Sequence, residues 1–140
     1  MKKSISIWSF ANKSIRDSIA LAKKAGFEGI ELALDEAGEI GMKTSAEELN
    51  SIKEHADNLG MKIHSVATGL YWSYSFSSDD DTQRAKALDI AVRQIETAKL
   101  LGADSVLIIP GHVGVSFAPG LGVVPYDKAY ARALAAMNEL

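Results

Sequence analysis

Three side chains able to hold a small polar ligand lie within or just after short apolar segments of this sequence. They are Trp8, Glu31 and His112. Carboxylate and imidazole groups form strong hydrogen bonds, and an imidazole can also bind a metal ion. An indole ring offers a large apolar surface on which a ligand can stack. His112 follows a Pro-Gly turn that exposes backbone after an apolar run, so we interpret it as a substrate or metal contact.

Hydrophobic patterning predicts an alternation of strands and helices that would position these side chains. Strands are predicted where apolar residues alternate or run without a break: Lys3–Phe10, Gly29–Leu34, Lys62–Thr68 and Ser105–Ile109. Helices are predicted where apolar residues recur at helical spacing: from Asn12 or Ser14 to Gly26, from Ser45 to Gly60, from about Thr82 to Gly102, and from Pro125 onward. Ser45 and Glu48 have the spacing of a capping box, which marks the start of the second helix.

One strand plus one helix forms a unit that repeats along the chain. Gly26, Gly60 and Gly102 end the first three helices at spacings of 34 and 42 residues. Right-handed crossovers of this kind build an open doubly wound sheet or a closed barrel. Four units make half of an eightfold barrel, which typically needs about 200 residues or more. We expect residues 1–140 to form a single α/β domain of parallel repeats, the amino-terminal half of a (β/α)8 barrel truncated near Leu140.

In a barrel, alternate residues of each strand face inward and the others face the helices. Ile5, Ile7, Ile30, Leu32 and Ile63 suit the helix side, which leaves these residues facing inward: Ser6, Trp8, Glu31, Ala33, His64, Val66 and Thr68. Polar groups on one side of three successive strands favour a functional site over a merely hydrogen-bonded polar core. Two simpler interpretations stay open. Glu31 can lie at a solvated strand end or pair with a lysine, and His64 can be a hydrogen-bonded interior histidine.

The long loop from Gly69 to Asp81 contains four aromatic residues: Tyr71, Trp72, Tyr74 and Phe76. They could form a lid that excludes water from a polar substrate. Alternatively some of them pack under their own loop, which is the interpretation we favour for Phe76. The acidic run Asp79–Asp81 lacks the alternating spacing of a calcium loop and is better interpreted as a helix start. The glycines after the fourth strand (Gly111, Gly114, Gly120 and Gly122) match no nucleotide-binding motif.

Composition excludes several classes of partner. The net charge of −3 has both signs interspersed, so neither nucleic acid nor an anionic membrane is predicted as a partner. The absence of cysteine excludes disulfides and thiolate metal sites and favours a cytoplasmic location. No apolar run approaches the ~20 residues that a membrane-spanning helix needs.

Four segments, taken in order, resemble the amino-terminal half of the xylose isomerase-like barrels. The segments are Ala25–Leu32, Thr68–Leu70, Ser77–Asp79 with Arg84 after it, and Leu101–Ala103 before an apolar strand. That family includes sugar isomerases, ketose 3-epimerases and their sugar-phosphate relatives. The resemblance covers nearly the whole chain and depends on the order and spacing of the segments together.

The resemblance implies an isomerase or epimerase that acts on a small sugar or sugar phosphate. A glutamate would abstract a proton next to a carbonyl, and a divalent metal (Mn, Mg or Zn) would hold neighbouring oxygens. In the family these catalytic and metal-binding residues come from the second barrel half, so we expect them beyond Leu140 and expect this chain alone to be inactive. Glu31 and the residues after the first, third and fourth strands give the candidate substrate-binding set: Trp8, Glu31, Thr68, Gly69, Leu70, Tyr71, Trp72, Gly111 and His112.

Two other functional classes stay open, a noncatalytic α/β binding or assembly domain and an endonuclease-like barrel that acts on abasic DNA. The nuclease is disfavoured because His64 and His112 do not align with its metal-binding histidines and the surface lacks a basic patch. A half-barrel also leaves its first and fourth strands with open edges, and neither carries a proline or an inward lysine that would block pairing. We therefore expect a homodimer or larger assembly.

Overall fold

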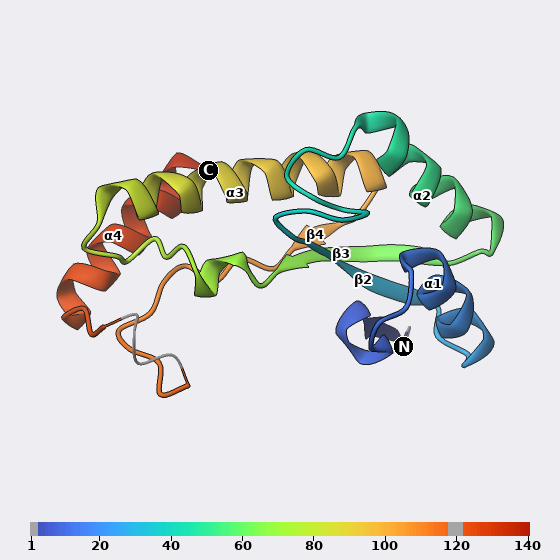
Figure 1. Cartoon of the computed structure of the whole chain (residues 1–140), viewed down its shortest axis with the longest axis horizontal. Helices are drawn as coiled ribbons and strands as arrows, with labels where there is room; N and C mark the ends of the chain where they lie inside the picture. Colours follow the sequence, from blue (N-terminus) through green and yellow to red (C-terminus); the bar gives the residue numbers. More distant parts are fainter. Residues whose placement is uncertain (1–2, 118–121) are drawn as a thin grey trace. The chain divides into compact units, whose positions relative to one another are not determined.

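The computed structural model describes residues 3–117 and 122–140, and it confirms the predicted alternation of strands and helices (Figure 1). In chain order the elements are β1 (Ser4–Ser6), the 3-10 helix η1 (Ile7–Phe10), α1 (Ile15–Lys24), β2 (Gly29–Leu34), α2 (Ala46–Asn58), β3 (Lys62–Thr68), the 3-10 helix η2 (Leu70–Trp72), α3 (Asp81–Leu101), β4 (Ser105–Val106) and α4 (Tyr126–Glu139). Gly120, one of the glycines after the fourth strand, lies outside the described residues. Within those residues, no helix is long and apolar enough to cross a membrane.

Contacts between residues divide the chain into two units. Unit 1 comprises Met1–Thr68 and Gln94–Leu107, and so contains the four strands, α1, α2 and the carboxyl-terminal part of α3. Unit 2 comprises Gly69–Arg93 and Ile108–Leu140, with η2, the amino-terminal part of α3 and α4. Each unit is made of two separate stretches of sequence, so the chain passes between the units three times.

Unit 1 is built on one parallel sheet with the strand order β1-β2-β3-β4. Ile30 and Leu32 of the central strand β2 are fully buried, as are Ile19 of α1 and Leu49 of α2. Helices α1 and α2 pack against each other. In addition, α1 packs on β2 and α2 packs on β3. Full burial of one such side chain contributes roughly 1.5–3 kcal/mol. The apolar face of the sheet and these two helices therefore form the core of unit 1.

Helix boundaries in unit 1 follow the capping signals of the sequence. The Ser14 hydroxyl accepts the Asp17 backbone N–H at the start of α1, and Ser45 with Glu48 forms the capping box at the start of α2. The glycines that follow α1, α2 and α3 have positive φ angles of 84°, 63° and 68° at Gly26, Gly60 and Gly102. Glycine adopts this left-handed conformation at low cost, so the predicted helix ends are confirmed.

Two strands are shorter than predicted. β1 ends at Ser6, because residues Ile7–Phe10 turn into η1, so the predicted alternation is wrong beyond Ser6. β4 ends at Val106 instead of Ile109. The Leu107 N–H still donates to the Val66 carbonyl, but the Leu107 carbonyl accepts the side-chain amide of Gln94 at 3.0 Å. A side chain of α3 thus takes the place of a strand-to-strand hydrogen bond.

A β-bulge in β3 changes which side chains face the helices. Ile30 pairs with Ile63, but the next pair is Glu31 with Ser65, so His64 is an extra residue in β3. Such a bulge reverses the alternation of every residue that follows it. His64 is exposed, and its Nδ1 lies 3.9 Å from the Asp104 carboxylate. His64 therefore lies outside the regular strand pairing, and its predicted inward orientation stays a prediction.

The same bulge overturns the predicted orientation of Val66 and Thr68. Val66 pairs with Leu32, and Thr68 pairs with Leu34, so both share the face that packs against the helices. Val66 is fully buried and Thr68 is 3% exposed, as expected for that face. The residue of β3 that pairs with Glu31, and so shares its face, is Ser65.

Unit 2 is held together by two arginines that bind the loop before α3. Arg84 of α3 donates to the Ser78 carbonyl at 2.7 Å, and Arg132 of α4 donates to the Ser77 carbonyl at 2.9 Å. Arg132 also donates to the Asp79 carboxylate at 2.8 Å, and this bond lowers the pKa of Asp79 below its usual range. Both helices of the unit are thereby tied to one short loop.

The acidic run before α3 acts as a helix start, as predicted. α3 begins at Asp81, and the Asp80 carboxylate accepts the Thr82 backbone N–H at 2.8 Å. Hydrogen bonds from Thr82 lower the pKa of Asp80, which keeps this carboxylate charged beside the helix N-terminus.

Candidate functional site

A row of polar residues crosses the whole sheet of unit 1 on the face away from the helices. Ser6 pairs with Glu31, Glu31 pairs with Ser65, and Ser65 pairs with Ser105, so the four residues lie side by side across four strands. Residues paired in this way point to the same face. Ile30 and Leu32, the neighbours of Glu31, are fully buried on the opposite face. We call these four residues the serine–glutamate row.

The Glu31 carboxylate is half-buried and has a defined partner. The Ser65 hydroxyl donates to Glu31 Oε2 at 2.8 Å, so a serine and not a lysine holds this carboxylate. The Ser6 hydroxyl oxygen, beside Glu31 on the other strand, is buried and has no hydrogen-bond partner in the described part of the chain. The Glu31 carboxylate can accept hydrogen bonds from a polyol, and the unsatisfied Ser6 hydroxyl beside it can donate one.

Trp8 lies in η1, directly after β1, with 60% of its surface exposed. η1 contacts β2, the strand that carries Glu31. Glu31 itself is the third of six residues in β2 and so lies in mid-strand, which corrects the prediction that it lies at the carboxyl end. An exposed indole has no packing role to explain it and is available to stack on a ligand.

In unit 2, the aromatic residues after β3 divide into a buried pair and an exposed pair. Tyr71 and Phe76 are each 1% exposed with ring centroids 5.3 Å apart, so the expectation for Phe76 is confirmed. Burial raises the pKa of the Tyr71 hydroxyl. Tyr71 is thus a core residue, and its predicted role in contacting substrate is wrong. Trp72 is 38% exposed and packs edge-on against Phe117, with the centroids 5.1 Å apart.

Gly69 and Leu70, the other two predicted residues of this segment, lead into η2. Gly69 is exposed and precedes η2, and Leu70 is half-buried as its first residue. The turn brings backbone and the Trp72 indole to the surface while Tyr71 points into the core.

A buried serine clamps the segment that carries His112. The Ser77 hydroxyl donates to the His112 carbonyl at 2.7 Å and lies 2.9 Å from the His112 backbone nitrogen, which donates back to it. Gly111 has φ 148°, and a Cβ there would lie 2.9 Å from Ser77 Cβ. Only glycine permits this close approach, so the Pro-Gly turn holds His112 in a fixed position.

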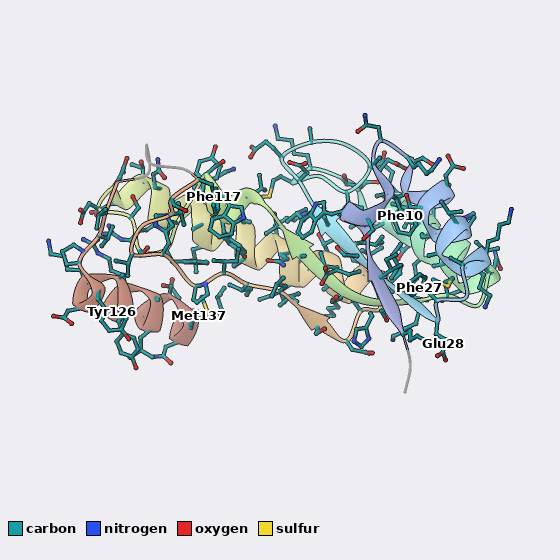
Figure 2. All side chains as sticks on the ribbon, turned by 90° about the horizontal axis from the view of Figure 1, so that it is seen from below. Phe10, Phe27, Glu28, Phe117, Tyr126 and Met137 are labelled. Carbon is teal, nitrogen blue, oxygen red and sulfur yellow. The ribbon has the colours of Figure 1, made fainter. Side chains whose placement is uncertain are left out.

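The His112 imidazole borders a pocket of about 220 Å³ in unit 2 whose lining is mostly apolar. The pocket is lined by residues of the Pro110–Val113 segment and of α4, among them Pro110, His112, Val113, Tyr126, Tyr130 and Ala133. Tyr126 lies at the start of α4 (Figure 2). Its ring is stacked on that of Tyr130, with the ring centroids 6.1 Å apart. Both ring nitrogens of His112 are buried and have no hydrogen-bond partner within the described residues. A buried imidazole that is unsatisfied in this way favours a ligand-contacting role over that of a structural core histidine.

Replacing His112 by leucine is expected to raise the free energy of unfolding by about 1 kcal/mol, because the buried nitrogens make no compensating hydrogen bond. Chemical denaturation measures the change. The matched control is His55→Leu, since His55 Nε2 lies 3.3 Å from the Arg16 carbonyl and loses a partner. Loss of stability in His112→Leu would show that the imidazole is satisfied in solution.

Sequence reasoning missed Ser65, Ser77 and Ser105. Ser65 and Ser105 reach the serine–glutamate row only because the bulge at His64 changes the strand register. Ser77 lies in the irregular part of a loop, where no periodicity applies. The pairing of Ser6 with Glu31 on the inward face is the part that strand alternation predicts correctly. Trp8 and Glu31 lie in unit 1, and Gly111 and His112 in unit 2, so their predicted gathering at one end of the sheet stays a prediction.

Across residues 3–117 and 122–140, no group of three or more His, Asp or Glu side chains could hold a metal ion. The divalent metal implied by the resemblance therefore has no candidate ligand set in the described part of the chain. The two candidate polar groups, Glu31 and His112, belong to separate units.

Four parallel strands that alternate with helices, with a polar row on the inner face of their sheet, define half of a (β/α)8 barrel. The chain belongs to the xylose isomerase-like TIM barrel family, whose model matches residues 19–140. A comparison with curated protein sequences gave no match.

Solved structures of sugar epimerases share this fold. A D-psicose 3-epimerase crystallised in the presence of D-fructose has a TM-score of 0.78 and 21% identity, over 99% of this chain and 47% of that one. The D-psicose 3-epimerase of Clostridium cellulolyticum H10 with D-tagatose has a TM-score of 0.75 and 16% identity, again over 99% and 47%. An L-ribulose 3-epimerase has a TM-score of 0.76 and 19% identity, over 99% and 44%. The chain thus spans about half the length of these relatives.

Proposed function

We propose that this chain supplies the ligand-binding half of a sugar or sugar-phosphate epimerase or isomerase that moves a proton at a carbon next to a carbonyl. The observation that carries the proposal is the serine–glutamate row on the inner face of the sheet. It is supported by the family membership and by the fold shared with epimerases whose structures were determined with D-fructose or D-tagatose. Both sugars are small ketoses rich in hydroxyl groups, which matches a surface made of hydroxyls and one carboxylate.

Each candidate residue has a role that its position allows. Trp8 stacks on the carbon skeleton, and Glu31 with Ser65 binds hydroxyl groups. The candidates in unit 2 form a separate set: the His112 imidazole, after Gly111, offers a hydrogen bond beside the apolar pocket, and Gly69, Leu70 and Trp72 belong to the turn after β3. Thr68 faces the helices, so only its backbone is available.

The chemistry itself requires groups that we do not assign within this chain. A divalent metal would polarise the carbonyl and lower the pKa of the adjacent C–H. The described residues contain no cluster suited to hold such a metal, and Glu31 is assigned to substrate binding only. The family resemblance leads us to expect the catalytic base and the metal ligands of the whole enzyme outside residues 1–140.

Replacing Trp8 by alanine is expected to weaken binding of D-fructose or D-tagatose about tenfold. The reason is that stacking of the indole ring on the sugar contributes about 1.4 kcal/mol to the binding free energy. Titration calorimetry or saturation-transfer NMR with the free ketose measures the affinity. Trp8→Phe is the matched variant and should keep most of the binding. Leu21→Ala controls for general loss of an exposed apolar side chain, since Leu21 is 39% exposed on α1.

If Trp8→Ala and the unchanged chain bind the ketose with equal affinity, Trp8 is not part of the ligand site. If no ketose or ketose phosphate binds to the folded chain, the noncatalytic α/β binding domain becomes the better interpretation.

A further inference from the structure

The Ser77 hydroxyl in unit 2 uses its whole hydrogen-bonding capacity on two neighbours. A serine hydroxyl can donate one hydrogen and accept two. The Ser77 hydroxyl donates to the His112 carbonyl at 2.7 Å and accepts the His112 backbone N–H at 2.9 Å. The Ser75 hydroxyl lies 2.9 Å away, so it must donate to Ser77, whose own hydrogen is already used. Both serines are buried, and a buried network with every member satisfied holds its groups in one arrangement.

The main chain of Ser77 is held separately, by an arginine of α4. Arg132 Nη1 donates one hydrogen to the Ser77 carbonyl at 2.9 Å and the other to the Asp79 carboxylate at 2.8 Å. The Arg132 side chain is 25% exposed, and hydrogen bonds from a charged donor are about twice as strong as those between neutral groups. The hydroxyl and the carbonyl of Ser77 are thus both anchored, so Ser77 cannot turn relative to the His112 main chain.

Arg84 makes a similar contact that does not reach His112. It lies on α3, donates to the Ser78 carbonyl at 2.7 Å and pairs with Asp81. Its side chain is 28% exposed, close to the value for Arg132. Both arginines tie the same loop to a helix, but of the two, Arg132 is the one that binds Ser77 in the described part of the chain. This difference allows a positioning role to be separated from a general contribution to stability.

We propose that Ser77 and Arg132 are positioning residues that hold the His112 imidazole for a hydrogen bond to an oxygen of the sugar. The two ring nitrogens of His112 have no hydrogen-bond partner within the described residues, so no bond of the ring itself sets its position. The position of the ring then depends on the main chain that carries it, and the Ser77 hydroxyl binds both polar groups of that main chain. This inference rests on the proposed function, because it takes His112 as a ligand contact.

The first test is spectroscopic and needs no ligand. In Ser77→Ala the His112 N–H and carbonyl lose their partner, so the NMR signals of the His112 ring should shift or split into more than one set. These signals are assigned by their absence from the spectrum of His112→Leu. The matched control is Ser75→Ala, which also removes a buried hydroxyl but leaves both bonds between Ser77 and His112 in place. Ring signals that move equally in the two variants, or in neither, would overturn the positioning role.

The second test uses the arginines and a ligand, and it stays decisive if Ser77→Ala does not fold. Arg132→Gln should shift the His112 ring signals and weaken binding of D-fructose or D-tagatose about fivefold. Arg132→Lys should recover most of both, because an ammonium group can donate to the same two oxygens. Arg84→Gln should lower the melting temperature about as much as Arg132→Gln, but it should leave the affinity within about twofold of that of the unchanged chain.

The outcomes separate this inference from the proposed function. If the unchanged chain binds neither ketose although Ser77→Ala moves the ring signals, the proposed function fails and with it the sugar as the ligand of His112, whereas the link between Ser77 and the ring is upheld. If a ketose binds and the two glutamine variants weaken binding equally, the proposed function stands and the positioning role of Arg132 is overturned.

Discussion

Replacing Gln94 by glutamate should cost about 3–5 kcal/mol of stability at neutral pH, because a carboxylate would face carbonyl oxygens in a buried position. The Gln94 side chain is fully buried, and its Nε2 donates to the Val66 carbonyl at 2.7 Å and to the Leu107 carbonyl at 3.0 Å. A carboxylate has no hydrogen to donate. The variant therefore loses two hydrogen bonds at the point where β3 and β4 separate and also buries a charge.

The penalty should depend on pH with a defined sign. Burial raises the pKa of the introduced carboxyl in the folded state above its unfolded value of about 4.3. The variant is thus closest to the unchanged protein below pH ~4.3, and the difference grows as pH rises towards the folded pKa. Denaturation of both proteins at several pH values measures the difference.

Gln83→Glu is the matched control for this variant, since Gln83 is half-buried in the first turn of the same helix. A carboxylate near a helix N-terminus is favourable, so Gln83→Glu should change stability little. If Gln94→Glu is also neutral, the Gln94 amide is not needed to hold β4 against β3.

Replacing Gly111 by alanine should destabilise unit 2 by about 1–3 kcal/mol and displace His112. The φ of 148° is unfavourable for alanine, and the new Cβ would lie 2.9 Å from Ser77 Cβ and 3.0 Å from Ser77 Oγ. Ser77 is fully buried and cannot move away without losing its hydrogen bonds to the His112 backbone. Thermal denaturation together with the NMR signals of the His112 ring reports both effects.

Gly69→Ala provides the comparison, because Gly69 is exposed with φ −87° and open space around the position of a Cβ. Its stability should stay within about 0.5 kcal/mol of the unchanged protein. Equal stability of the two alanine variants would show that the Ser77 contact is not rigid.

Signals that depend on a few neighbouring residues gave the reliable predictions. The capping box at Ser45 and the glycines after three helices specify local backbone geometry, and the structure has them where they were predicted. The four parallel strands and the half-barrel class follow from those boundaries, because helix length and crossover handedness leave few topologies.

The predictions that failed depended on strand register. A single extra residue at His64 moves Val66 and Thr68 to the helix face and brings Ser65 to the serine–glutamate row. Nothing in the local sequence of β3 distinguishes a bulge from regular alternation, since both faces are buried beyond this point. Tyr71 was misassigned for a similar reason. The sequence of the loop does not show which of its aromatic residues are buried, as Tyr71 is, and which are exposed, as Trp72 is.

The division of α3 has a consequence for any attempt to dissect the protein genetically. Unit 1 takes residues from both sides of the Gly69–Arg93 stretch, and α3 continues from one unit into the other at Arg93 and Gln94. No cut at a single position in the gene separates the two units, and a fragment that ends after Thr68 lacks β4 and the Gln94 amide. Terminal deletions remove residues of one unit only while they stay within residues 1–68 or 108–140, and any longer deletion removes parts of both units.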